Sequence, residues 1–272
     1  MAIKAGFISY LNAYPFLFPF ENHQDENWQL TIDRPGTLNA KLRAGELDIS
    51  LISSLEYAAN FQDYEIVPHI ALSSKGYVDS VKLISKRDFK DLNGAHIAVT
   101  NSSASSIVIL KVLLKHWNIQ ATFEAYQAQD DIPQNFDAAL TIGDEAMIQE
   151  DGLYKYSFDL GQMWQEVFQR NVVFAIAAVR KESLAQNAKE IQRLVAKLQQ
   201  APKDSAQNEA ELAKACSKNF PKINNHLDYL KLLDYDLDEQ RISNLQFMFD
   251  KAYQAGLLER AVELNFLNSI VQ

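Results

Sequence analysis

The chain has 272 residues, a formal net charge of −9 and 47% hydrophobic residues, enough to bury the core of one large domain or of two lobes. This acidic balance, without any run of lysine and arginine, argues against nucleic acid or an anionic membrane surface as a partner. No apolar run approaches the ~18 residues that span a bilayer, so no transmembrane segment is expected.

The first part of the chain is predicted to alternate strands and helices. An apolar run at 2–8 passes into an uncharged loop at 9–15, which indicates a buried strand that delivers a loop to a cleft. Ligands of open α/β sheets bind where strands end, so this loop is the first candidate for a binding site. Further strands are expected at 28–32, 47–52, 64–71 and 77–85, and helices at 35–44 and 55–61.

The pattern restarts near residue 92 as a second α/β unit. Strands are predicted at 96–100, 121–126 and 136–142, with a helix at 107–117. A strand-helix-strand succession implies parallel pairing with right-handed crossovers. The apolar run at 172–179 is expected to return the chain to the first unit. Helices are predicted after it at 182–200, 205–217 and 237–266, the last one broken at Gly256.

These elements predict an α/β protein with two lobes, the first made of residues 1–83 and 175–272 and the second of residues 84–174. Two crossings of the chain would leave a cleft between the lobes. That is the architecture of the type 2 periplasmic-binding-protein fold, whose lobes close on a small ligand.

A serine-rich loop is the strongest candidate for an anion site. Thr100 and the serines after it, which include Ser103, Ser105 and Ser106, precede a helix whose N–H groups and hydroxyls suit a carboxylate or a phosphate. Ordinary helix capping is the alternative, but four serines within 102–106 exceed what capping needs.

Three further stretches of small polar residues are candidates for the same site. The first opens a short helix, and capping is its leading alternative. The second either turns the chain or lets a ligand approach the backbone, and the third either caps a helix or meets a ligand. In chain order these residues are Ser53, Ser54 and Glu56, then Ser74, Gly76 and Ser80, then Gly143 and Asp144.

Conventional catalytic and metal-binding signatures are missing from the sequence. The five histidines are scattered, so no metal site is expected, and there is no GxSxG, P-loop or GxGxxG motif. The single Cys216 excludes an internal disulfide and indicates a reducing compartment. Because no secretory leader precedes the first strand, the expected location is the cytoplasm.

Seven short motifs follow one another over about the first 180 residues. They are Ser9-Tyr10-Leu11-Asn12-Ala13-x-Pro15, Pro35-x-x-Leu38-Asn39-x-x-Leu42-x-x-Gly45-Glu46-x-Asp48, Ser53-x-x-Glu56-Tyr57, Ser73-Ser74-x-Gly76-x-Val78-x-Ser80-Val81, Thr100-x-x-Ser103-x-Ser105-Ser106, Ile142-Gly143-Asp144 and Asp159-Leu160. In this order they resemble the chorismate dehydratases of the futalosine route to menaquinone. An ordered series of this length is far more specific than any one motif.

The resemblance implies the two-lobed fold and a cytoplasmic enzyme, without metal or organic cofactor, that removes water from chorismate to give 3-[(1-carboxyvinyl)oxy]benzoate. Chorismate is then the expected partner, and the protein is expected to be a monomer or a homodimer. Asn12 would hydrogen-bond the substrate where charge develops or the hydroxyl leaves. The base stays open between the substrate's own enolpyruvyl carboxylate and Glu56 or Asp144.

Our hypothesis is that different loops hold the two ends of the substrate. One carboxylate would be held by the serine-rich loop, and the other end by the first loop and the short helix that follows the third strand. The hydroxyls concerned are those of Ser103, Ser105 and Ser106 at one end and of Ser9, Tyr10, Ser53 and Ser54 at the other.

Other functions stay open at this point, among them a transferase that acts on chorismate. A non-catalytic binding protein for a small carboxylate would share the fold. The sister 1,4-dihydroxy-6-naphthoate synthase carries a different first loop, and Ser9-Tyr10-Leu11-Asn12 favours the dehydratase. The chain departs from the family at 168–172, where Phe-Gln-Arg-Asn-Val replaces the usual Thr-Gly-Leu-Pro-Phe.

Overall fold

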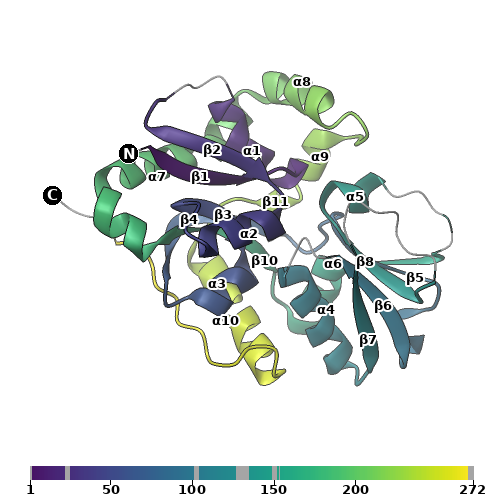
Figure 1. Cartoon of the computed structure of the whole chain (residues 1–272). Coiled ribbons are helices and arrows are strands. Elements are labelled where there is room, and N and C mark those ends of the chain that lie inside the picture. Colours follow the sequence, from purple (N-terminus) through teal and green to yellow (C-terminus); the bar gives the residue numbers. More distant parts are fainter. Residues whose placement is uncertain are drawn as a thin grey trace.

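The computed structural model consists of two α/β units that lie side by side (Figure 1). The structure describes residues 2–21, 25–100, 104–126, 135–148, 152 and 154–268. One unit is built on a six-stranded sheet of order β11-β4-β10-β3-β1-β2 and the other on a five-stranded sheet of order β7-β6-β8-β5-β9. The predicted two-lobed α/β architecture is therefore confirmed.

The first sheet is fully buried at its centre, where every residue of β3 is inaccessible to solvent, as expected for a strand covered on both faces. Its strands are β1 (Ile3–Ile8), β2 (Trp28–Asp33), β3 (Ile49–Ser53), β4 (Tyr64–Ser74), β10 (Val173–Arg180) and β11 (Leu233–Asp234). The helical elements of this part of the chain are η1 (Leu11–Ala13), α1 (Tyr14–Leu17), η2 (Phe18–Phe20), α2 (Pro35–Arg43) and α3 (Ser54–Asn60), followed after β10 by α7 (Lys181–Gln207), α8 (Glu209–Asn219), α9 (His226–Leu230) and α10 (Glu239–Gln254).

The second sheet lies in the middle of the chain. Its strands are β5 (Val81–Ser85), β6 (Ala95–Thr100), β7 (Ala121–Tyr126), β8 (Ala138–Ile142) and β9 (Tyr156–Asp159), with η3 (Phe89–Asp91), α4 (Ala104–His116), α5 (Gly143–Ile148) and α6 (Leu160–Phe168) between and after them. None of the described helices, in either unit, is long and apolar enough to cross a membrane.

Both sheets are mixed. The parallel pairing predicted for the second unit is confirmed for β6 with β7 and β8, and β1 also pairs in parallel with β2 and β3. β10 runs antiparallel to β3 and β4, and β5 runs antiparallel to β8 and β9. The chain reaches both strands by crossing from the other unit, so the rule for crossovers within one sheet does not apply to them.

The strand pairing bears on where one lobe ends and the other begins. All of β5 belongs to the second sheet and all of β10 to the first, so the expected divisions at 83/84 and 174/175 fall inside these strands. We propose instead that the chain changes lobe at 75–80 and again at 169–172.

The break predicted at Gly256 is confirmed, but the helix predicted at 237–266 does not resume after it. α10 ends at Gln254, and Gly256 takes a positive φ of 72°, which stops the helix. The segment 257–268 then runs back over the first unit, where Phe266 forms a parallel bridge with Ile66. This C-terminal segment carries few helix-breaking residues, so its periodicity alone wrongly predicts that the helix continues.

Candidate active site

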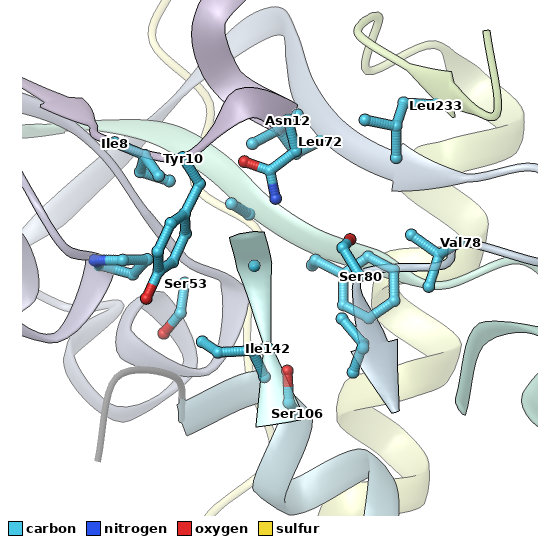
Figure 2. A pocket seen from close by; sticks show the side chains of 15 residues that line it. Ile8, Tyr10, Asn12, Ser53, Leu72, Val78, Ser80, Ser106, Ile142 and Leu233 are labelled. Atoms are coloured by element: carbon cyan, nitrogen blue, oxygen red, sulfur yellow. The ribbon is translucent and has the colours of Figure 1, made fainter. Parts of the chain in front are cut away.

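A cavity lies between the two lobes, where strands of both sheets end (Figure 2). Its volume is about 50 Å³, which holds a few water molecules but is far below the roughly 300–1,000 Å³ of ordinary ligand pockets. Its lining is Ile8, Tyr10, Asn12, Pro35, Ser53, Leu72, Val78, Ser80, Val81, Ser106, Ile142, Gly143, Phe174, Ala175 and Leu233. The lining carries no formal charge and combines apolar walls with a few hydroxyls and one amide, as small-molecule sites do.

Asn12 is the polar side chain of η1 that faces this cavity. In Figure 2 its amide lies above Ser80 and Ser106. Its side-chain oxygen is buried and has no hydrogen-bond partner among the described residues. A buried oxygen left without a partner costs roughly 1–3 kcal/mol, so this atom is set up to meet a ligand or a bound water.

The loop that carries Ser80 is clamped from both sides. The Asp159 carboxylate accepts hydrogen bonds from the N–H groups of Val78 at 3.2 Å and Asp79 at 2.7 Å, and it also caps α6 by accepting from Gln162 N at 2.9 Å. The Ser80 carbonyl accepts from Gly143 N at 2.7 Å. The backbone around Ser80 is therefore fixed before any ligand arrives.

Gly143 and Asp144 join the second lobe to the first loop. Gly143 has a φ of 63°, and a Cβ there would lie 2.8–2.9 Å from ring carbons of Tyr10, so only glycine admits this contact without strain. The Asp144 carboxylate accepts from Leu11 N at 2.9 Å. Burial raises the pKa of Asp144 to about 6 despite this hydrogen bond. Asp144 stands beside the cavity without lining it.

Glu56 points away from the cavity. Its carboxylate pairs with Arg43 at 2.8 Å and accepts from Asn60 Nδ2 at 2.9 Å and from Tyr64 Oη at 3.4 Å. Burial raises the pKa of Glu56, against the opposing effect of Arg43. These contacts give Glu56 a structural role under the first sheet and leave Asp144 as the titratable carboxylate beside the cavity.

At the starts of α3 and α4, some serines line the cavity and others make structural hydrogen bonds. Ser53 lines the cavity, but its hydroxyl also accepts from Glu56 N at 3.2 Å as the N-cap of α3. Ser106 lines the cavity from α4. Ser105 links the lobes instead, because its hydroxyl donates to Phe174 O at 3.0 Å and accepts from Leu55 N at 3.2 Å. Ser103 lies outside the described residues.

The other expected site residues surround the cavity without lining it. Ser9 donates its N–H to Asp33 O at 2.9 Å, and Ser54 donates its hydroxyl to Val173 O at 2.7 Å. Thr100 is buried at the end of β6, and the backbone of Gly76 lies against the side chain of Gln165. The Ser74 hydroxyl is buried and without a partner among the described residues.

The sequence does not predict the apolar residues of the cavity wall, nor that a residue from the C-terminal part of the chain lines the cavity. Leu72 lies just past the predicted strand at 64–71 and Phe174 lies in the apolar run at 172–179, and only the strand register could have assigned them to the cavity. Leu233 comes from β11, a two-residue strand between the predicted helices at 205–217 and 237–266. Among the described residues no three His, Cys, Asp or Glu side chains gather as metal ligands.

The two-lobed fold occurs in known structures. The chain is similar to protein AF1704 from Archaeoglobus fulgidus (TM-score 0.77, 17% identity, 94% of this chain and 98% of that chain) and to the periplasmic aliphatic sulphonate binding protein SsuA from Escherichia coli (0.62, 14%, 97% and 95%). The protein therefore has a periplasmic-binding-protein-like fold, a class whose ligands bind between the lobes.

The sequence comparison is more specific. Residues 3–254 match the menaquinone biosynthesis family, and the chain belongs to that family. A protein of Thermus thermophilus named chorismate dehydratase is 28% identical over 224 residues, which are 75% of this chain and 79% of that protein.

Proposed function

We propose that this protein is a chorismate dehydratase, a carbon–oxygen lyase of menaquinone biosynthesis. The observation that carries the proposal is the buried, unpartnered oxygen of Asn12 at an uncharged cavity between the lobes, in a member of this family. The relative named chorismate dehydratase supports the choice of substrate.

The reaction removes the ring hydroxyl of chorismate and the ring proton at the carbon that bears the ether. One water leaves, and the product, 3-[(1-carboxyvinyl)oxy]benzoate, is aromatic. Because aromatisation makes the overall step strongly favourable, the site mainly has to orient the substrate, move one proton and stabilise the charge on the leaving group. The neutral hydroxyl and amide groups that line the small cavity can donate hydrogen bonds to the leaving group.

The substrate is a dianion, and no lining residue carries a positive charge. We place one carboxylate at the N-terminal turn of α4, where Ser106 lines the cavity and where backbone N–H groups and the helix dipole favour an anion. Ser103 stays a predicted member of this group. Ser53 and Tyr10 also line the cavity, and they would position the other end of the substrate.

Two candidates for the base follow from the contacts of the carboxylates. Glu56 is engaged by Arg43 and Tyr64, so the substrate's own enolpyruvyl carboxylate and Asp144 are the groups to compare. Asp144→Asn keeps an oxygen that can accept from Leu11 N but cannot take a proton at neutral pH. Loss of turnover in this variant would assign the base to Asp144, and retained turnover would assign it to the substrate.

The test of the proposed function is a direct assay. The purified protein is incubated with chorismate, and products are separated by liquid chromatography and weighed by mass spectrometry. The expected product is lighter than chorismate by one water and keeps the enolpyruvyl ether. Unchanged chorismate that nevertheless raises the Tm of the protein would favour a non-catalytic binding protein and contradict the proposal.

The role of Asn12 has its own test. Asn12→Ala removes the amide that faces the substrate, and Asn12→Asp replaces its donor by a negative charge. Both variants are expected to lower kcat by about 10²–10³, as loss of one preorganised donor does, with a smaller effect on KM. Normal kcat in both would refute the role.

We further propose that the protein works in the cytoplasm, in the futalosine route. Support comes from the motif series in the first part of the chain and from Cys216, the single cysteine, which is buried and free.

A further inference from the structure

Tyr229 is a buried tyrosine from the C-terminal part of the sequence that contacts Ser80, a residue of the cavity lining. It lies in α9, and its residue is 4% exposed. Its hydroxyl donates to Ser80 Oγ at 2.8 Å, across 149 positions of the chain. Burial raises the pKa of Tyr229 well above its usual range, so the phenol keeps its proton and stays a donor.

This contact fixes the direction of the Ser80 hydroxyl. A serine hydroxyl has one hydrogen to donate and two lone pairs that accept. Tyr229 occupies one lone pair of Ser80, so the Ser80 hydrogen points elsewhere. No described residue accepts that hydrogen, and Ser80 lines the same cavity as Asn12.

The contact also makes the Ser80 hydroxyl a better donor. Hydrogen bonds in a chain polarise one another, and the effect is larger in a buried, low-dielectric site than in water. The backbone of Ser80 is held independently by Gly143 N and by the Asp159 clamp on the preceding residues. Tyr229 is therefore not needed to keep the loop in place, and its contact acts on the hydroxyl itself.

We propose that Tyr229 is a positioning residue that holds the Ser80 hydroxyl as a hydrogen-bond donor to the oxygen that leaves the substrate ring, or to the oxygen on which charge develops. The inference rests on the proposed dehydratase function. Because the donated bond strengthens only as charge appears, its loss lowers kcat more than it weakens substrate binding.

The experiment is a double-mutant cycle on kcat and KM with chorismate. Tyr229→Phe removes only the hydroxyl, and Ser80→Ala removes the group that it orients. We expect Tyr229→Phe to lower kcat about tenfold with KM within about twofold of the wild type, and Ser80→Ala to lower kcat further. In the double variant the Phe substitution should have no additional effect, since Tyr229 acts only through the Ser80 hydroxyl.

Tyr57→Phe is the matched control, because its hydroxyl is also buried and hydrogen-bonded but contacts the C-terminal segment. It should lower the Tm and leave kcat unchanged. Rates are compared at a temperature at which every variant is folded, as shown by thermal unfolding curves.

Three results would overturn the inference. The first is an unchanged kcat in Tyr229→Phe, and the second is a rise in KM alone. The third is an effect of Tyr229→Phe on kcat that is as large in the Ser80→Ala variant as in the wild type. Should Tyr229→Phe fail to fold, an unchanged kcat in Ser80→Ala refutes the inference by itself. A wild-type protein that leaves chorismate unchanged would refute the proposed function and this role with it, whereas an active wild type with a fully active Tyr229→Phe variant refutes only the role.

Discussion

At the scale of single residues, Asp144 is the group whose ionisation the fold disturbs beside the cavity. Burial raises its pKa to about 6, compared with ~3.9 for an aspartate in an unfolded chain. Between these values the folded protein binds more protons than the unfolded chain. The contribution of Asp144 to stability is therefore greatest at low pH, falls as the pH rises from about 4 to about 6, and stays low above that.

Asp144→Asn should accordingly stabilise the protein in a pH-dependent way. The amide oxygen can still accept from Leu11 N, and the buried charge is gone. Urea unfolding should give a larger free energy of unfolding for the variant than for the wild type above about pH 6, and no difference near pH 4.

Asp137 provides a control of opposite sign, because hydrogen bonding by His96 N and the nearby Arg87 lower its pKa. Asp137→Asn should destabilise the protein at neutral pH and lose that effect as the pH falls. Equal behaviour of the two variants would contradict the assignment of the Asp144 shift to burial.

Gly143 makes a second prediction at this scale. A Cβ at Gly143 would both adopt a positive φ and press on the Tyr10 ring at 2.8 Å. Gly94 has a φ of 77°, and a Cβ there would have nothing within 4 Å. The loss of stability in Gly94→Ala therefore measures the backbone strain alone. Both alanine variants should lose about 1–2 kcal/mol of stability from that strain. Only Gly143→Ala should also lower kcat/KM, and an equal kcat/KM in the two would show that the Tyr10 contact is unimportant.

At the scale of elements, one hydroxyl of α3 makes two of the hydrogen bonds that hold the C-terminal segment 257–268 to the first unit. Tyr57 Oη donates to Glu263 O at 2.8 Å and accepts from Asn265 N at 2.7 Å. Tyr57→Phe leaves two backbone groups without this partner and should cost about 1–3 kcal/mol of stability. Hydrogen exchange should speed up in the C-terminal segment before it does in β3, and uniform acceleration in both would argue against a local anchor.

The elements also show how far the sequence predicts this structure. Strands at 3–8 and 173–180 are largely apolar runs, and strands at 28–33 and 121–126 alternate apolar and polar residues, so their patterns locate them well. The helix end at Gln169 could not be located this way. Gln169 takes a left-handed φ of 54°, where the family usually has glycine, and its own side chain donates to the carbonyls of Gln165 and Glu166. Because glutamine stands where glycine usually marks the end of a helix, the sequence pattern does not reveal this helix end.

The candidate site was predictable to a similar extent. Asn12, Ser80, Ser106 and Gly143 stand at strand ends and helix starts, where free backbone groups gather, so pattern and resemblance both lead to them. Glu56 shows the limit of prediction from sequence. A glutamate in the first turn of a helix gives the same sequence pattern whether its side chain faces a ligand or pairs with an arginine. Tyr229 had no local signal at all, since its contact with Ser80 depends on how the C-terminal helices pack on the lobe junction.

At the scale of the whole molecule, the small cavity implies that the lobes separate to admit a substrate. Contacts that hold them together include Asp144 with Leu11, Ser105 with Leu55, and the ion pair of Arg34 with Glu145 at 2.8 Å. The side chains of that ion pair are 26% and 31% exposed, so its net contribution is at most about 1 kcal/mol and is screened by salt.

Arg34→Ala should therefore weaken the closed form modestly. We expect KM for chorismate to rise by up to about fivefold at low salt and the difference from wild type to shrink at high salt. Arg193→Ala is the matched control, because Arg193 pairs with Asp25 and Glu190 within one lobe and should leave KM unchanged. A salt-independent effect, or the same effect in both variants, would contradict the assignment to lobe closure.

The position of β10 has a consequence for how the protein is made. β10 lies between β3 and β4 and pairs with both, yet the ribosome produces it about a hundred residues after them. During synthesis the first four strands emerge with a gap in the middle of their sheet, while the intervening residues already contain all strands of the second sheet. The nascent second lobe can fold first, and the apolar edges of β3 and β4 stay exposed until β10 arrives, which makes this interval the one in which the chain most needs protection from aggregation.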